Sequence, residues 1–148
     1  MSVIWENYLW DKEKPLTPDE LVNAENVLGI HFPDDYKTVV MHNQGKSPSP
    51  ACFKINPKRV DVFSSLLHFC ESGPESSNVL WNYNTLREFL PEKIIPFADT
   101  PGGDFICFDF REDSVKVVYA SHEKTGDQAI TPLANTFSEF IDGLYEEE

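Results

Sequence analysis

The sequence predicts an α+β fold, in which a single twisted antiparallel sheet of about four to six strands carries helices packed on it. Three observations predict it: capped helical segments early in the chain, three alternating segments joined by short loops after residue 93, and a capped apolar helix near the end. A chain of 148 residues buries roughly 70% of its unfolded surface. We therefore expect one domain over residues 1–148 that folds without a disulfide or a cofactor.

Two helices are expected in the first third of the chain. Residues 17–20, Thr-Pro-Asp-Glu, combine an N-cap hydroxyl, a proline at the first helical position and a glutamate three residues after the cap. Gly29 supplies the end of this helix. A second helix is expected to begin at residues 34–35, because two aspartates favour the positive end of a helix, and to end at residues 43–45, Asn-Gln-Gly.

The middle of the chain is expected to combine a loop, two short strands and a third helix. Residues 46–50 contain two prolines and are predicted to form a loop. Segments 52–55 and 59–63 are expected as short strands around a turn. Apolar residues at helical spacing predict a helix over 79–90, which Pro91 ends.

From residue 93 the apolar pattern changes from helical to alternating. The alternation predicts the three central strands of an antiparallel meander, at 93–98, 105–110 and 115–121. Gly102 and Gly103 are most simply a hairpin turn, with a backbone nest for an anion or ligand as the alternative. The last helix is expected over 136–145, where Thr136 and Glu139 form a capping box.

The balance of charge excludes one class of function. The chain has 12 Lys and Arg against 25 Asp and Glu, a formal net charge of −13. Direct nucleic-acid binding is not expected, because it relies on basic side chains that neutralise phosphates. Residues 75–148 alone hold 5 basic and 15 acidic side chains. This excess either keeps the protein soluble by self-repulsion or attracts a basic partner.

The N-terminus and the cysteines predict a cytoplasmic protein. Residues 1–7 lack the layout of a secretory signal, and no apolar segment approaches the roughly 18 residues of a membrane span. The chain has an odd number of cysteines, and no two of them form a CxxC pair: Cys52, Cys70 and Cys107. We expect reduced thiols packed as small hydrophobic side chains, because disulfide frameworks and metal sites use paired cysteines.

Motifs for catalysis are missing from the sequence, so we expect a protein that is not an enzyme and needs no metal. The GxGxxG, P-loop, GxSxG and HExxH patterns are absent. Asp104 and Asp109 are an odd number of positions apart, and an unbroken strand directs them to opposite faces. We therefore expect a structural role for Asp109, as a hydrogen-bonded carboxylate or at the rim of the sheet.

Two parts of the chain resemble the signature of a known superfamily. One is the helix that begins at residues 32–37, Phe-Pro-Asp-Asp-Tyr-Lys, and ends at residues 43–45. The other is the segment 95–99, Ile-Pro-Phe-Ala-Asp, followed by residues 102–109, Gly-Gly-Asp-Phe-Ile-Cys-Phe-Asp. Together they resemble the SUKH superfamily, in the branch related to fungal cell-wall-synthesis regulators. Gln44 departs from the usual pattern, in which a small residue follows the asparagine.

The resemblance implies a function as well as the α+β fold, and it supplies no catalytic residue. Bacterial domains of this kind are known mainly as immunity proteins of polymorphic toxin systems, where each blocks a toxin, often a nuclease, encoded beside it. This chain looks like the antitoxins paired with LXG-type toxins. A toxin gene immediately upstream favours that function, and its absence favours a regulatory adaptor that binds several cellular proteins.

We hypothesise that the protein binds a cognate toxin through the basic surface of that toxin. A nuclease presents Lys and Arg to phosphates, so an acidic protein competes for the same groove. The candidate acidic contacts, all on predicted loops, are Asp99, Asp104, Glu112, Asp113, Glu123 and Asp127. Trp81 and Tyr119 are candidate aromatic anchors, with a core position as the favoured alternative for Trp81. An apolar interface is the alternative to the acidic one, and the oligomeric state stays open.

Overall fold

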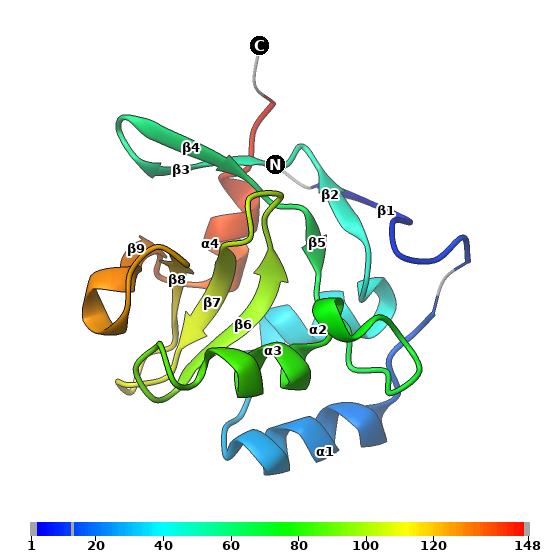
Figure 1. The fold of residues 1–148 in the computed structure, drawn as a ribbon. Coiled ribbons are helices and arrows are strands. Elements are labelled where there is room, and N and C mark those ends of the chain that lie inside the picture. Colours follow the sequence, from blue (N-terminus) through cyan, green and yellow to red (C-terminus); the bar gives the residue numbers. More distant parts are fainter. Residues whose placement is uncertain (1–2, 13, 147–148) are drawn as a thin grey trace.

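The computed structural model describes residues 3–12 and 14–146, and it shows an α+β fold (Figure 1). The helices are α1 (Pro18–Leu28), α2 (Asp34–Asn43), α3 (Val79–Leu86) and α4 (Phe137–Asp142). The strands are β1 (Ile4–Glu6), β2 (Ser47–Ser49), β3 (Cys52–Asn56), β4 (Arg59–Val62), β5 (Ser65–Leu66), β6 (Ile94–Asp99), β7 (Phe105–Asp109), β8 (Lys116–Ala120) and β9 (Ile130–Ala134). Two 3-10 turns, η1 (Glu75–Ser77) and η2 (Gly126–Ala129), precede α3 and β9.

The main sheet has five strands in the order β5-β6-β7-β8-β9, and every neighbouring pair is antiparallel. Its central strands β6, β7 and β8 are the meander that the alternating pattern predicts. The register between β6 and β7 shifts between Pro96 and Ala98. A proline has no N–H to give to the ladder, and a bulge is where a sheet accommodates it.

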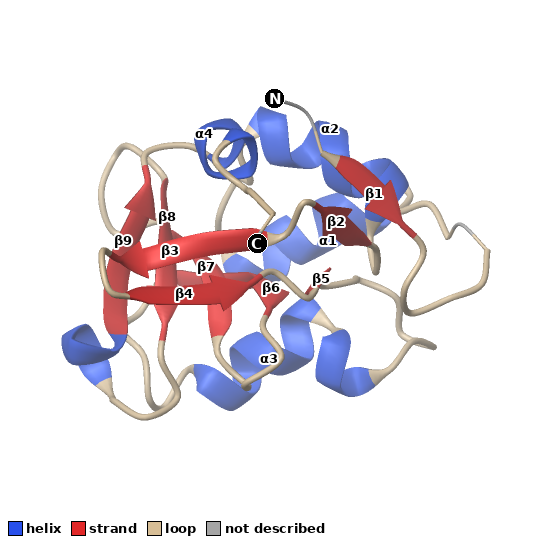
Figure 2. Ribbon diagram, turned by 90° about the horizontal axis from the view of Figure 1, so that it is seen from above, coloured by secondary structure: helices blue, strands red, loops and turns tan. Residues whose placement is uncertain are grey.

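The expectation of a single sheet is wrong, because two further strand pairs stand apart from the main sheet. Strand β1 pairs with β2, so that residues 47–49, expected as a loop, form a strand. Strands β3 and β4 form a two-stranded hairpin that lies across the main sheet (Figure 2), and Cys52 of β3 also bridges Tyr145 near the C-terminus. Strands of two or three residues are too short to show alternation, and β9, which was also missed, contains Pro132 at a sheet edge.

Capping signals predicted the starts of α1 and α4 correctly. Thr17 and Glu20 form the expected capping box of α1, and Gly29 follows it in the left-handed conformation with a φ of 71°. At α4 the hydroxyl of Thr136 accepts a hydrogen bond from Glu139 N at 3.0 Å. This bond is one of the two that define the expected capping box. Among the described residues, no helix has the length and apolar character needed to cross a membrane.

Helix α3 is shorter than predicted. It begins at Val79 as expected but ends at Leu86 instead of Leu90. The chain continues as a hydrogen-bonded turn, in which Leu90 N donates to Leu86 O at 3.1 Å. Helix α4 likewise ends at Asp142, short of the expected residue 145. The last residues of a helix are the least accurate part of a prediction from sequence patterns.

The larger core lies between one face of the main sheet and helices α2 and α4, and it is rich in aromatic rings. Phe97 and Phe108 stack with their ring centroids 4.3 Å apart. Tyr36 of α2 lies edge-on to Phe108 at 4.9 Å and to Phe137 of α4 at 5.4 Å. Such offset and edge-on pairs stabilise a fold beyond the area that they bury.

The other face of the main sheet carries a smaller core. Its buried residues are Ile94, Cys107, Val118 and Ala120. Leu90, from the turn after α3, and Ile130, the first residue of β9, pack against them. All three cysteines of the chain are free, and two of them, Cys70 and Cys107, are buried as expected. Burial raises the pKa of the Cys107 thiol, so this residue acts as a small hydrophobic side chain.

Candidate functional site

The turn between β6 and β7 positions the carboxylate of Asp104. Gly103 adopts a φ of 91°, a conformation that favours glycine. The hydroxyl of Thr100 accepts a hydrogen bond from Asp104 N and donates one to Asp104 O, both at 3.1 Å. The expected hairpin turn is therefore confirmed, and the hydroxyl of Thr100 fixes the backbone from which the Asp104 side chain projects.

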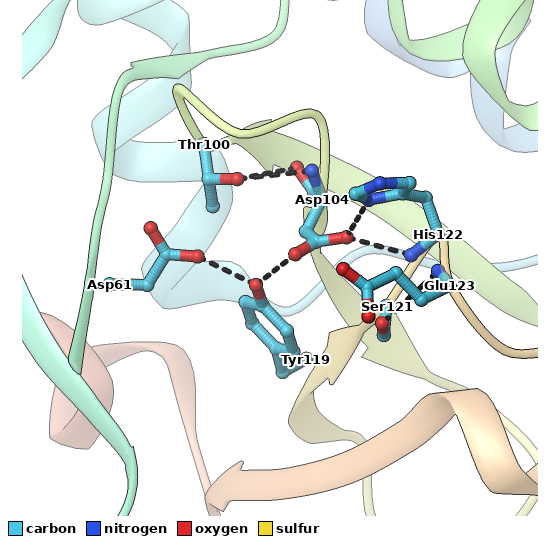
Figure 3. Close-up of polar contacts among 7 residues, drawn as sticks. All are labelled: Asp61, Thr100, Asp104, Tyr119, Ser121, His122 and Glu123. Atoms are coloured by element: carbon cyan, nitrogen blue, oxygen red, sulfur yellow. Dashed lines mark hydrogen bonds and ion pairs between the residues drawn. The ribbon is translucent and has the colours of Figure 1, made fainter. Parts of the chain in front are cut away.

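Asp104 is the centre of a polar network that joins three parts of the chain (Figure 3). Its Oδ1 accepts from His122 N at 2.7 Å and lies 2.5 Å from His122 Nδ1. Its Oδ2 contacts the hydroxyl of Tyr119, which also lies 2.6 Å from Oδ2 of Asp61 on β4. The hydroxyl has one hydrogen, so it donates to one carboxylate at a time. These contacts tie the β3–β4 hairpin to β8 and to the connection that follows it.

The network sets the charges of its members. Burial acts to raise the pKa of Asp104, but hydrogen bonds from Tyr119 and His122 and the charge of His122 outweigh it and hold that pKa below its usual value. The hydrogen bond to Asp104 and its negative charge raise the pKa of His122. Burial, and then the two carboxylates, raise the pKa of Tyr119. The arrangement favours an ionised Asp104, a protonated His122 and a neutral Tyr119.

His122 also borders an apolar pocket of about 240 Å³ on the side of the smaller core. Phe89 and Leu90 line one side of the pocket, and the connection after β8 lines the other. Gly126 N donates to Phe89 O at 2.7 Å and holds these two segments together. A general base must be unprotonated to accept a proton, whereas Asp104 favours the protonated form of His122. The pocket therefore presents a hydrogen-bond donor beside an apolar wall.

Asp109, at the other end of β7, belongs to a separate ion-pair cluster. Arg111 Nε donates to Asp109 Oδ1 at 3.0 Å, and Arg111 Nη2 donates to Oδ2 at 2.8 Å. Arg111 Nη1 reaches Oδ1 of Asp127 on η2 at 2.7 Å. The two aspartates of β7 and its preceding turn thus serve different networks, in line with their odd spacing. No group of three His, Cys, Asp or Glu is placed to hold a metal ion within the described part of the chain.

Four of the predicted acidic contacts are exposed, and they lie on the two connections that flank β8. Glu112 and Asp113 lie in the loop before β8, and Glu123 and Asp127 lie in the connection after it. The side chain of Asp127 is 85% exposed although it pairs with Arg111. None of the ion pairs within residues 3–12 and 14–146 involves Glu112, Asp113 or Glu123. Arg111 brings Asp127 against the loop that carries Glu112 and Asp113.

Comparison with known proteins identifies the family. Residues 15–143 match the SMI1 / KNR4 family (SUKH-1). The chain belongs to this family. It is also similar to the SPbeta prophage-derived uncharacterized protein YokK of Bacillus subtilis (strain 168), with 26% identity over 147 residues that cover 88% of this chain and 76% of the relative. The family resemblance seen in the sequence is therefore confirmed over most of the SUKH-1 chain.

Two residues expected at the contact surface of this SUKH-1 domain are buried. Tyr119 is 1% exposed, and Asp104 is buried beside it, so neither side chain is presented to a partner. Their burial follows from the meander, which directs Tyr119 into the larger core. Asp99 is partly buried and accepts hydrogen bonds from Ser65 N and Oγ, both at 3.1 Å. The surface-contact hypothesis is corrected for Tyr119 and Asp104, which hold the scaffold together.

Trp81 differs from expectation in the opposite direction. A core position on the third helix was the simpler interpretation, but Trp81 is 42% exposed. The buried residues of α3 are Val79 and Asn82 instead. The tryptophan stands on the first turn of α3, where its backbone N donates to the Asn78 side chain at 3.0 Å. Its ring is available to a partner on a different element from the acidic loops.

Sequence reasoning missed Asp61 and His122, both members of the Asp104 network. A signal for His122 was present, because the register of β7 and β8 pairs Phe105 with Ala120 and so brings the residue before β7 close to the residues after β8. Asp61 gave no such signal. It reaches Tyr119 only because the β3–β4 hairpin folds across the main sheet, and the two residues are 58 positions apart.

Proposed function

We propose that this SUKH-1 domain is an immunity protein that binds a cognate protein toxin, a nuclease of an LXG-type polymorphic toxin system, and neutralises it by stoichiometric occlusion. The protein acts in the cytoplasm and contributes no catalytic step. Family membership supports this function, because bacterial domains that resemble this one are known mainly as immunity proteins. The exposed acidic connections on either side of β8 provide a surface on which such binding can occur.

The observation that carries the proposal is the exposed carboxylates on the two connections flanking β8. Glu112, Asp113 and Glu123 are exposed without an ion-pair partner among the described residues, and Asp127 shares Arg111 with Asp109. Unpaired carboxylates attract the Lys and Arg side chains with which a nuclease holds phosphates. Complementary charge speeds association, toward about 10⁸–10⁹ M⁻¹s⁻¹ at low salt. Occlusion of the basic groove then inhibits the toxin without chemistry.

The test begins with the gene that neighbours the gene of this protein. The toxin domain encoded there is co-expressed with the full-length chain, and growth and formation of a one-to-one complex are measured. Rescue of growth with a stable complex supports an immunity protein. Continued toxicity, together with weak binding to several unrelated proteins, supports the regulatory adaptor instead.

The electrostatic mechanism is tested with a charge-reversed variant, in which Glu112, Asp113, Glu123 and Asp127 are replaced by lysine. We expect the association rate at low salt to fall by roughly tenfold or more, and its salt dependence to flatten, because steering is screened by salt. The matched control makes the same change of charge at exposed carboxylates on other elements, namely Glu6, Asp11, Asp142 and Glu146. Equal effects of the two variants would show that net charge, and not these loops, governs association.

A further inference from the structure

A groove of about 670 Å³ lies between α1, residues 69–78 and the first turn of α3. Figure 1 shows α1 below α3, with the chain that follows β5 running beside them. The floor of the groove is apolar and includes Ala24, Phe69 and Leu80. Its described lining residues are distinct from the Asp104 network and from the acidic loops around β8.

The groove has an excess of negative charge. Glu20, Glu71 and Glu75 line it, and Lys14 is the one basic residue among its described lining residues. Lys14 is itself engaged, because its Nζ lies 5.0 Å from the centre of the Trp10 ring and 3.4 Å from Ser72 Oγ. Neither Glu71 nor Glu75 forms an ion pair within the described part of the chain. A cation that enters the groove therefore finds two free carboxylates.

The wall of the groove is preformed by a buried histidine. His68 Nδ1 accepts a hydrogen bond from Cys70 N at 3.0 Å, so Nε2 carries the hydrogen and donates to Pro74 O at 2.8 Å. Burial lowers the pKa of His68, which keeps the ring neutral in this role. A Cβ on Gly73 would lie 2.5 Å from the ring, so only glycine allows the loop to pass this close. A wall held in place before binding reduces the entropy lost on association.

Trp81 adds an aromatic surface to the same groove. It lines the groove and leaves 42% of its surface exposed, although burial of a tryptophan is strongly favourable. Exposed tryptophans beside a cavity are typical binding anchors, and the face of an indole attracts a guanidinium group. The groove thus combines an apolar floor, free carboxylates and an indole ring.

We propose that this groove binds a basic segment of the protein partner, with an arginine side chain placed against Trp81 and paired with Glu71 and Glu75. A guanidinium group suits this site because its flat face stacks on an indole while its N–H groups donate to carboxylates. The inference rests on the proposed function in one respect, since it takes the partner to be the toxin. It gives the partner a second contact surface, separate from the acidic loops.

The test uses the full-length ¹⁵N-labelled protein and a probe peptide, acetyl-Gly-Arg-Gly-Arg-Gly-amide, with the same peptide carrying Glu in place of Arg as the matched probe. We expect saturable NMR shifts of the Trp81 indole N–H and of the amides of residues 71–75, which weaken at high salt. Trp81→Ala lowers the affinity roughly two- to fivefold, the size of an exposed cation–π contact. Glu71→Gln with Glu75→Gln lowers it at least about threefold, through the loss of two ion pairs.

The control variant carries Glu112→Gln with Asp113→Asn, which removes the same charge from the acidic loops and leaves the affinity of the groove unchanged. Shifts confined to residues 112–127, or groove shifts that survive both groove variants, overturn the inference, as does binding of the Glu peptide with equal affinity. Inhibition of the toxin is scored separately. Groove binding without inhibition overturns the proposed function alone, and inhibition without groove binding overturns this inference alone.

Discussion

Two buried tyrosines lie in the same aromatic core and differ in the hydrogen bonding of their hydroxyl groups. Tyr36 of α2 and Tyr119 of β8 are 0% and 1% exposed. The Tyr119 hydroxyl contacts the carboxylates of Asp61 and Asp104. The Tyr36 hydroxyl has no hydrogen-bond partner among the described residues. Burial raises the pKa of both hydroxyls, so the difference between them lies in their partners and not in their charge.

The difference shows what each tyrosine contributes. A buried hydroxyl without a partner destabilises a fold, whereas one that is hydrogen-bonded offsets its loss of water. For Tyr36 the stabilising part is the ring, which contacts Phe97, Phe108 and Phe137. For Tyr119 the hydroxyl itself joins β8 to the hairpin and to the Asp104 turn.

The largest effect is expected from Asp104→Ala. The change removes the acceptor shared by Tyr119 and His122, and we expect the free energy of unfolding to fall by about 2–4 kcal/mol. Chemical denaturation measures it. Asp109→Ala, at the other end of β7, is the matched control and should cost about 1 kcal/mol or less, because its partner Arg111 is solvent-accessible. Similar losses in the two variants would show that the Asp104 network adds little to stability.

Tyr119→Phe is expected to have the next largest effect. The ring stays in the core, but Asp104 and Asp61 lose their shared donor, and stability should fall by about 1–2 kcal/mol. Thermal and denaturant unfolding both measure this change. A double-mutant cycle with Asp104→Asn should show strong non-additivity, because the two side chains are in contact. Strictly additive losses would mean that the contact does not couple them.

Tyr36→Phe should change stability in the other direction or hardly at all. Removal of a buried hydroxyl without a protein partner leaves the ring contacts intact, so we expect a change within about 0.5 kcal/mol of zero or a small gain. The measurement is the same unfolding experiment used for Tyr119→Phe. A loss as large as that of Tyr119→Phe would contradict the contrast between the two tyrosines.

The smallest contribution to stability is expected from the pairing of His122 with Asp104, but this pairing should change the pKa of His122 clearly. NMR titration should give His122 a pKa above its ordinary value of about 6.5, and Asp104→Asn should return it toward that value. Because the folded pKa is raised, the pairing stabilises the fold below the unfolded pKa and loses this contribution as pH rises through the folded pKa. For Asp104 the pKa is lowered, so its contribution is present above the unfolded pKa and is lost as pH falls through the folded one. An unchanged His122 pKa in Asp104→Asn would refute the pairing.

Local signals in the sequence were sufficient to place the starts of the helices and the central strands. The capping box of Thr17 and Glu20 joins residues three positions apart, and the turn at Gly103 depends on the conformational freedom of one residue. The alternation after residue 93 likewise placed β6, β7 and β8, because each strand buries its own apolar side chains. Strands β1, β2, β5 and β9 were missed, since short or proline-containing segments gain their structure from the strands that they pair with.

The charge of the protein, its family motif and its local elements follow from the amino-acid sequence alone, because they depend on composition or on residues close along the chain. The availability of a side chain to a partner depends instead on how distant segments pack. Asp104 and Tyr119 are buried in the packed sheet, where Tyr119 also contacts Asp61 of the β3–β4 hairpin, 58 positions away. Trp81 was left exposed because α3 buries Val79 and Asn82 instead. Exposure depends on distant segments that cover a residue, and the residue's own neighbours in sequence do not specify them.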